Sequence, residues 1–331
     1  MPVIQKITKF TTYTCAAALA LWGVKYAIAP AYEGRVGIGK SEAFAPIRNA
    51  TLDFHIWYPA QAGGRSVTVG GNGVFYGTVA GRGAPHRQGQ FPMVLIPHGA
   101  GGNADQFGWI AAALADAAVR VWERPADITA VIDHIVAQPQ DYPYIDTNRI
   151  AALGFSVGGY TAMAVLGARV DTAALQGFCN RCDHGMSDCA FLARGGVDLH
   201  ALDLSSAAQD LPDARIKAAV VIDPGIGETF MLSSLSKVDI PMMIVNLGDA
   251  GTIPAVVDAS EAAKLILKAQ YRRLDDATHF SFLAQCKPKR DKILKNEGEA
   301  DLLCDDAGGR GRGAIHTELK DFIVAYLSAQ F

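Results

Sequence analysis

The sequence has few charged residues and little net charge. Charged side chains make up 19% of the 331 residues, and 30 basic residues against 33 acidic residues give a formal net charge of −3. Because there is no basic excess, the composition gives no electrostatic argument for nucleic-acid binding. Half of the residues are hydrophobic, which excludes a disordered chain and allows a large buried core.

The hydrophobic run near the N-terminus is too short for a comfortable membrane span. Lys6 and Lys9 precede the run "CAAALALWGV" at residues 15–24, and small residues follow at 27–29. A basic region, a short apolar run and small residues are typical of an export signal. We therefore expect residues 1–30 to direct the protein to the periplasm or the outside of the cell. The alternative is an uncleaved anchor, which would be the protein's attachment to a membrane.

Cysteine is also scarce, with six residues in the chain. In an exported protein, cysteines are more often disulfide-bonded than bound to metal. A zinc site could be drawn in "CNRCDHGMSDC" with His184, but the single residue between Cys182 and His184 is poor ligand spacing. We therefore expect disulfides rather than a zinc site. The five cysteines beyond the export segment are Cys179, Cys182, Cys189, Cys286 and Cys304, of which the last two bracket a polar excursion.

The sequence contains no internal repeat and no linker that would divide it. It predicts one domain over residues 31–331, with a cysteine-containing insertion at about 171–214. Apolar strands alternate with amphipathic helices, which predicts an α/β fold with a mostly parallel sheet and helices on both faces. Strands are expected at 34–44, 49–60, 91–98, 149–153, 216–223, 241–249 and 270–280, with residues 62–90 as a glycine-rich connection. Helices are expected at 104–117, 124–138, 160–170 and 314–331.

A candidate nucleophile lies in the stretch "RIAALGFSVGGYTAMA", residues 149–164. An apolar strand is followed by Gly-Phe-Ser-Val-Gly and then by residues at helical spacing, which is the context of a G-x-S-x-G nucleophile elbow. The glycines at 154 and 158 let the strand and the helix pass close to the serine. Ser156 is therefore the predicted nucleophile, and a serine that caps a helix is the alternative.

A serine nucleophile requires a base, and the base requires an acid that orients it. His279 is the best candidate base, because it follows the last predicted strand and precedes the C-terminal helix. The acid is either Asp223 in "VVIDPG" or Asp249 in "VNLGDAGTIP", since each follows a strand downstream of the serine. The sequence slightly favours Asp223, which directly follows its strand.

Donors for an oxyanion are expected on both sides of the serine. The glycine-rich loop "PHGAGG", residues 97–102, follows a central strand and can direct a backbone N–H toward the reacting carbonyl. The N–H of Ala100 in this loop and the N–H of Val157 are the predicted donors.

These motifs together resemble the α/β-hydrolases, and among them the dienelactone hydrolase and platelet-activating-factor acetylhydrolase type II-like branch, which includes bacterial polyester hydrolases. The resemblance implies a serine esterase or lipase that cleaves short or modified acyl esters of small molecules without metal or cofactor. It also matches the family's serine and histidine to Ser156 and His279. The resemblance rests on "IWYPA" (56–60), "PHGAGG" (97–102), "RPADITAVIDHI" (124–135), "GFSVGGYTA" (154–162), "VVIDPG" (220–225) and "ATHFSFLAQC" (277–286).

The chain departs from the family between residues 117 and 123. The family has a central strand and a loop before the "RPADIT" helix, whereas only "AAVRVWE" is available here. A shortened or missing interior strand would leave backbone groups unpaired, which is costly. A catalytically impaired hydrolase-fold binding protein is therefore the alternative to an enzyme.

A remote alternative is a nucleotide-binding protein. The stretch "GRVGIGKS", residues 34–41, matches the P-loop pattern G-x-x-x-x-G-K-[ST], in which Lys40 would contact phosphates and Ser41 a magnesium ion. A P-loop requires a helix directly after the motif, but Pro46 follows too soon for one. A strand with glycines is the expected structure.

Overall fold

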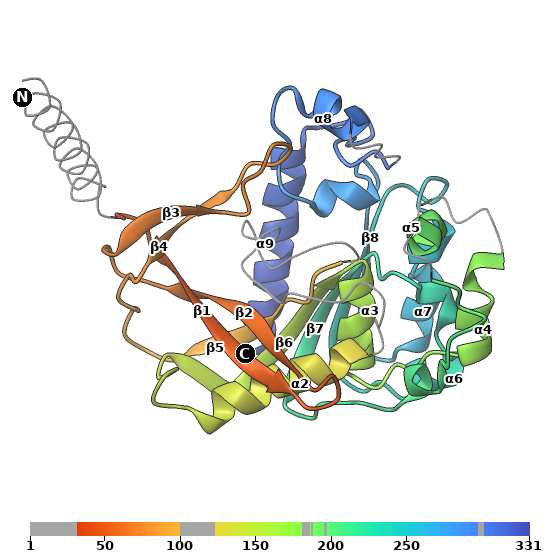
Figure 1. Cartoon of the computed structure of the whole chain (residues 1–331), viewed down its shortest axis with the longest axis horizontal. Helices are drawn as coiled ribbons and strands as arrows, with labels where there is room; N and C mark the ends of the chain where they lie inside the picture. Colours follow the sequence, from red (N-terminus) through yellow and green to blue (C-terminus); the bar gives the residue numbers. More distant parts are fainter. Residues whose placement is uncertain (1–31, 100–122, 181–185, 187, 195–196, 297–300) are drawn as a thin grey trace, which may run out of the picture. The chain divides into compact units, whose positions relative to one another are not determined.

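The computed structural model describes residues 32–99, 123–180, 186, 188–194, 197–296 and 301–331 (Figure 1). These residues form two compact units. The smaller unit comprises the described residues up to Ile38 together with Tyr58–Val67 and Val79–Arg87. The larger unit comprises Gly39–Trp57, Thr68–Thr78 and Gln88–Phe331, and it contains every described residue of the candidate site.

Within the described residues, a five-stranded parallel sheet forms the centre of the larger unit, with the strand order β5-β6-β7-β8-β9. Its strands β7 and β8 are almost completely buried, as expected for a parallel sheet covered on both faces. The C-terminal ends of parallel strands meet at one edge, which is where ligands bind in open α/β sheets. The strands are β5 (Phe91–Leu95), β6 (Ile145–Phe155), β7 (Ile216–Ile222), β8 (Met242–Leu247) and β9 (Ala269–Leu274).

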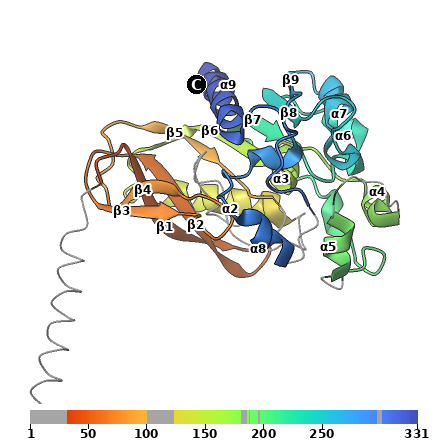
Figure 2. The same ribbon diagram turned by 90° about the horizontal axis from the view of Figure 1, so that it is seen from above.

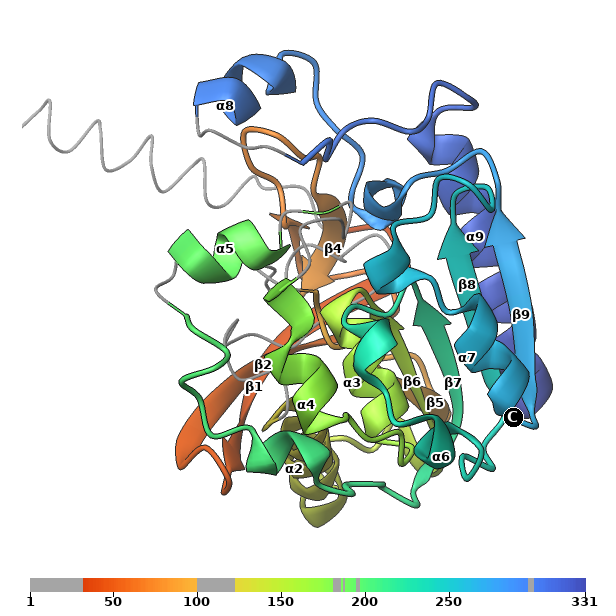
Figure 3. The ribbon, with the colours of Figure 1, turned by 90° about the vertical axis from the view of Figure 1, so that its right-hand side faces the viewer.

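Helices cover both faces of this sheet, which is the predicted α/β architecture (Figures 2 and 3). Alternate residues of each strand enter two separate cores, so that Val221 packs with the helices α2 and α3 while Val220 packs against α9. The helices are α2 (Arg124–Ala137), α3 (Val157–Ala164), α4 (Thr172–Gln176), α5 (Asp188–Arg194), α6 (Leu232–Leu235), α7 (Ser260–Leu265), α8 (Arg290–Asn296) and α9 (Arg312–Gln330). The 3-10 turns are η2 (Phe178–Asn180), η3 (Ser205–Ala208), η4 (Gly227–Thr229), η5 (Ala255–Val257) and η6 (His279–Phe282).

The predicted helix at 124–138 corresponds to α2, with Pro125 in its first turn. Proline is favoured there because the first N–H groups of a helix have no acceptor within it. Among the described strands, β5 pairs only with β6. The expected helix at 104–117 and residues 118–122 of the shortened segment lie outside the described residues, as does the expected export signal at 1–30.

A second sheet has the strand order β2-β1-β4-β3. The expectation that residues 62–90 only connect strands is wrong, because they contain β3 and β4. The strand β3 is only five residues long, and the glycines on both sides of it conceal it in the sequence. The strands are β1 (Val36–Ala45), β2 (Ala50–Pro59), β3 (Arg65–Val69) and β4 (Thr78–Arg82), and β1 pairs with β4 in parallel.

The stretch "GRVGIGKS" continues into β1 without a helix, so the nucleotide-binding alternative is wrong. Lys40 and Ser41 both lie within the strand, whereas a P-loop places them at the start of a helix. The Ser41 hydroxyl lies 2.7 Å from the Tyr142 hydroxyl. Among the helices of the described residues, none is long and apolar enough to span a lipid bilayer.

Candidate active site

Ser156 lies between β6 and α3 in a backbone conformation that is rare for an L-residue. Its φ is 56° and its ψ is −129°. Such a conformation costs roughly 1–3 kcal/mol and persists only when the surroundings enforce it. Two backbone bonds do so here: the Ser156 N–H donates to Ile222 O at 3.0 Å, and Ser156 O accepts from Gly225 N at 2.8 Å. The strand-turn-helix context predicted for this serine is present.

Glycine is required at positions 154 and 158, on either side of the serine, because there is no room for a side chain. A Cβ atom at Gly154 would overlap the carbonyl oxygen of Gly158, and one at Gly158 would overlap the carbonyl oxygen of Pro97. The backbone of α3 therefore lies directly against the ends of β5 and β6, which fixes the serine relative to both strands.

We expect Gly158→Ala to destabilise the protein by about 3 kcal/mol, because the added carbon meets backbone that cannot move aside without displacing the segment after β5. Gly39→Ala is the matched control, since a Cβ there meets no atom within 4 Å. Urea denaturation of both variants measures the difference. A Gly158→Ala protein as stable as Gly39→Ala would contradict the close packing of the elbow.

His279 and Asp223 form a buried pair beside this turn. His279 is 4% exposed and Asp223 is fully buried, and His279 Nδ1 lies 3.0 Å from Asp223 Oδ2. The imidazole also stacks on the ring of Phe155, the residue before Ser156, with 4.6 Å between the ring centroids. The residue after β7 and the first turn after β9 are thus brought together at the end of β6.

The other oxygen of Asp223 accepts two hydrogen bonds from β8. Asn246 Nδ2 donates to Oδ1 at 2.8 Å, and the Leu247 N–H donates to it at 2.9 Å. Asn246 is itself held, because its Oδ1 accepts from the Ala259 N–H at 3.0 Å and from the Tyr271 hydroxyl at 3.2 Å. Burial raises the pKa of Tyr271, which keeps this hydroxyl protonated and able to donate.

Asn246 was not among the residues expected at the site. The signal in the sequence is a single amide within the apolar strand "MMIVNL", which is completely buried in the structure. A buried polar side chain without partners costs free energy, so its presence there indicates a specific hydrogen-bonding role.

We expect Asn246→Leu to lower kcat about tenfold, because Asp223 loses a charge-assisted hydrogen bond that contributes about 1.5–3 kcal/mol. Tyr271→Phe is the graded control: it removes only the bond to Asn246 Oδ1 and leaves both donors on Asp223. Steady-state kinetics of the two variants should therefore differ. Equal activity in Asn246→Leu and the wild type would show that Asp223 does not depend on Asn246.

The structure does not bring Asp249 to His279. Asp249 is exposed after β8, and its carboxylate accepts the Gly251 N–H at 2.8 Å. Of the two acids that the sequence left open, Asp223 is the one in contact with the imidazole.

One expected oxyanion donor lies within the described residues and the other does not. Val157 is the first residue of α3, where backbone N–H groups have no acceptor within the helix. Ala100 lies outside the described residues. The segment that leads to Ala100 passes close to the serine. A Cβ atom at Gly99 would lie 3.2 Å from Ser156 Cβ.

The segment that follows β5 is held by Arg124 from the first turn of α2. Its guanidinium donates to the carbonyl oxygen of His98, and the side chain is almost completely buried. Burial lowers the pKa of Arg124 to about 10, so it is still a cation at neutral pH. A cation therefore fixes the start of the "PHGAGG" loop.

Among the described residues there are two disulfides, Cys179–Cys189 and Cys286–Cys304. The second closes the excursion that the sequence brackets with these two cysteines. The first uses two of the cysteines in the zinc alternative, while Cys182 and His184 lie outside the described residues. In the part of the chain that the structure describes, no cluster of His, Cys, Asp and Glu could hold a metal ion.

The α/β-hydrolase fold is defined here by three features. They are the parallel sheet, the strained turn at Ser156, and the order in which Ser156, Asp223 and His279 follow one another along the chain. Residues 93–173, which include the serine turn, match the prolyl oligopeptidase family. The chain therefore has the α/β-hydrolase fold.

Solved structures are similar in fold. A ferulic acid esterase from Streptomyces cinnamoneus is 14% identical, with 92% of each chain covered and a TM-score of 0.58. A putative dipeptidyl aminopeptidase IV from Bacteroides ovatus is 11% identical, with 89% of this chain and 36% of that chain covered and a TM-score of 0.47. No curated protein matches the sequence. The comparisons do not distinguish an ester from a peptide substrate. They do not confirm the dienelactone hydrolase branch.

Proposed function

We propose that the protein is a serine hydrolase that cleaves carboxylic esters with short or modified acyl chains through an acyl-enzyme intermediate. Ser156 is the nucleophile, His279 the base and Asp223 the acid. The observation that carries this proposal is the buried 3.0 Å contact between His279 Nδ1 and Asp223 Oδ2 beside the strained serine turn.

In the proposed reaction these residues act in turn. With Asp223 accepting the Nδ1 proton, the unprotonated Nε2 of His279 takes the proton of the Ser156 hydroxyl as Oγ attacks the ester carbonyl. The N–H groups of Val157 and Ala100 stabilise the oxyanion. The tetrahedral intermediate then collapses, the C–O bond to the alcohol breaks, and His279 gives its proton to the leaving oxygen. Water repeats the sequence on the acyl-enzyme and releases the carboxylic acid.

An ester is the proposed substrate because the sequence motifs resemble the esterase branch. The ferulic acid esterase neighbour, whose fold spans nearly the whole chain, accords with this proposal. A peptide substrate is the second candidate, favoured by the match of residues 93–173 to the prolyl oligopeptidase family. The same nucleophile, base and oxyanion donors serve acyl transfer from either leaving group.

We also propose that the protein is exported. Two disulfides in the described part of the chain suit an oxidising compartment, because thiols in the cytosol are kept reduced. The basic and apolar N-terminal segment would direct this export.

The test combines labelling with substrate choice. The purified full-length protein should react with a fluorescent fluorophosphonate, and it should hydrolyse p-nitrophenyl acetate and butyrate faster than the p-nitroanilide of a prolyl dipeptide. Turnover of the peptide alone would replace the ester proposal by the peptide proposal. A folded protein, verified by circular dichroism, that neither reacts with the probe nor hydrolyses these substrates would contradict a serine hydrolase and favour the binding protein.

A further inference from the structure

The turn that carries His279 is short and depends on contacts from elsewhere. It consists of the single 3-10 turn η6, which begins after Thr278 and ends before Leu283. Such turns have poorer hydrogen-bond geometry than α-helices and are not stable alone. Thr278 and Ser281 close the turn on itself, since the Thr278 N–H donates to Ser281 Oγ at 3.0 Å. The orientation of the imidazole therefore depends on what holds these two residues.

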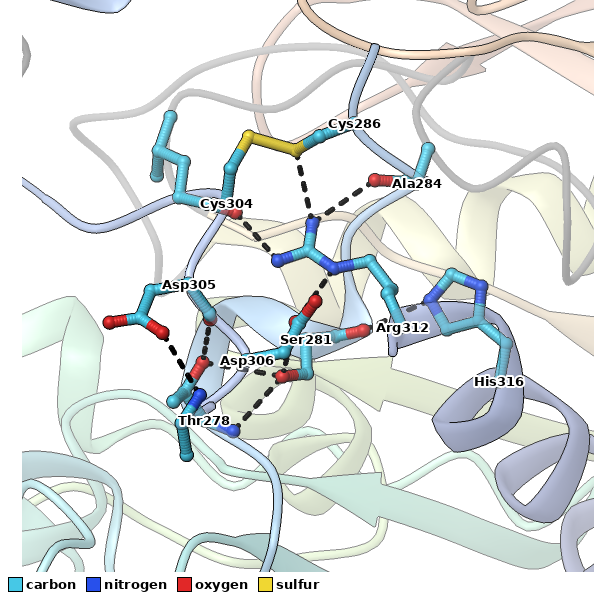
Figure 4. Close-up of polar contacts among 11 residues, drawn as sticks. Thr278, Ser281, Ala284, Cys286, Cys304, Asp305, Asp306, Arg312 and His316 are labelled. Carbon is cyan, nitrogen blue, oxygen red and sulfur yellow. Dashed lines mark hydrogen bonds and ion pairs between the residues drawn. A yellow bond between two sulfur atoms is a disulfide. The ribbon is translucent and has the colours of Figure 1, made fainter. Parts of the chain in front are cut away.

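Both residues are held from the segment that follows the disulfide (Figure 4). The Ser281 hydroxyl donates to Asp306 Oδ1 at 2.8 Å, and the Thr278 hydroxyl donates to the Asp305 carbonyl oxygen at 2.7 Å. His316 on α9 contacts the same turn, with its Nε2 2.9 Å from Ser281 O. Burial lowers the pKa of His316 to about 4, so at neutral pH it is a neutral imidazole that donates to this carbonyl.

Arg312, the first residue of α9, connects this segment to the excursion. It is 5% exposed, and its Nε donates to Asp306 Oδ1 at 2.9 Å. Its Nη1 donates to Ala284 O at 3.1 Å, just before the excursion, and its Nη2 donates to Leu303 O at 2.8 Å, near the end of the excursion. A buried guanidinium is costly without such acceptors, and only its planar fork reaches several at once.

The disulfide closes the same loop that Arg312 spans. Cys286 and Cys304 lie close in sequence to the residues whose carbonyls accept from Arg312, and Arg312 Nη1 lies 3.5 Å from Cys286 Sγ. The two ends of the loop are therefore held together both by the disulfide and by the side chain of Arg312.

We propose that Arg312 is a positioning residue for His279, acting through Asp306 and Ser281 on the turn that carries the imidazole. This proposal rests on the proposed function, since it assigns His279 as the base. A small displacement of a catalytic group can reduce the rate by up to about a hundredfold without changing substrate contacts. The expected signature is therefore a change in kcat rather than in KM.

The experiment compares Ser281→Ala, Arg312→Lys and Arg312→Gln with two controls in the full-length protein. Ser234→Ala removes another buried hydroxyl, which donates to Met231 O, and Arg215→Gln removes an arginine paired with Asp213 and Asp133 beside the start of β7. Kinetics with p-nitrophenyl acetate, thermal unfolding, and the downfield ¹H NMR signal of the His279 Nδ1 proton are measured for each. Loss of this signal in His279→Gln assigns it.

We expect Ser281→Ala and Arg312→Gln to lower kcat by about tenfold or more with KM nearly unchanged, and to shift or broaden the Nδ1 signal. Arg312→Lys should retain more activity than Arg312→Gln, since it can still pair with Asp306. The controls should leave kcat and the signal unchanged at similar losses of thermal stability.

Unchanged kcat and an unchanged Nδ1 signal in Ser281→Ala would overturn the proposal, even if Arg312→Gln fails to fold. Equal kcat losses in the control variants at equal stability would also overturn it. The NMR signal separates this proposal from the proposed function. If the wild-type protein hydrolyses no substrate, a shift of the signal confined to Ser281→Ala and the Arg312 variants still supports positioning.

Discussion

Replacing Ser156 by alanine should abolish ester hydrolysis and fluorophosphonate labelling, with kcat lower by about 10⁶-fold. The hydroxyl is the only group of this residue that the proposed reaction consumes. The fold should survive, because the bonds that hold the turn are made by the backbone of Ser156, including the one from its N–H to Ile222 O. Labelling followed by gel fluorescence, with circular dichroism on the same sample, measures both outcomes.

Ser234→Ala is the control for this experiment. Ser234 is also a buried serine, but its hydroxyl donates to Met231 O and it lies at α6. Full labelling of this variant together with none in Ser156→Ala would assign the reactive serine. Persistent labelling of Ser156→Ala would show that another residue is the nucleophile.

Replacing Asp223 by asparagine should lower kcat by about 10⁴-fold. Two N–H groups, from Asn246 and Leu247, point at Oδ1 and require an acceptor there. An asparagine would therefore place its oxygen at that position and its amide group toward His279 Nδ1. A donor at Nδ1 forces the imidazole proton onto Nε2, where the base must accept one. Asparagine tolerates the left-handed backbone, so the φ of 42° at this position adds little strain.

Asp249→Asn provides the comparison, because Asp249 is exposed and bonded to the Gly251 N–H. Its activity should equal that of the wild type when both are assayed from weakly acidic to weakly basic pH. A strong loss in Asp249→Asn with little loss in Asp223→Asn would reverse the assignment of the acid. No loss in either variant would contradict a triad with an aspartate from β7 or β8.

The centre of the sheet was predictable because β7 and β8 are almost entirely apolar. The stretch "IKAAVVIDPG" has a single charge before the strand is complete, and Pro224 marks its end, so both the strand and the position of Asp223 follow from local sequence. The serine turn was predictable for a similar reason: Gly154 and Gly158 serve as markers for a contact between backbones that no other residue allows.

The acid could not be chosen from the sequence, because the choice depends on distances across the sheet. Asp223 and Asp249 both follow strands and both precede turn residues, and only the three-dimensional arrangement separates them. The role of Asn246 depends on the same arrangement, since its partners come from the end of β7, from β9 and from the segment before α7. The contacts of Arg312 with residues 284 and 303 could not be predicted either, because hydrophobic periodicity in a sequence indicates only local structure.

The disulfide between Cys286 and Cys304 also determines what happens if a protease cuts the chain between them. The exposed helix α8 lies in this loop, whereas His279 lies before it and α9 after it. A cut within α8 would leave α9 covalently attached to the rest of the protein, so the helix that covers one face of the sheet would stay in place. A nicked protein should therefore migrate as one species without reductant and as two with it.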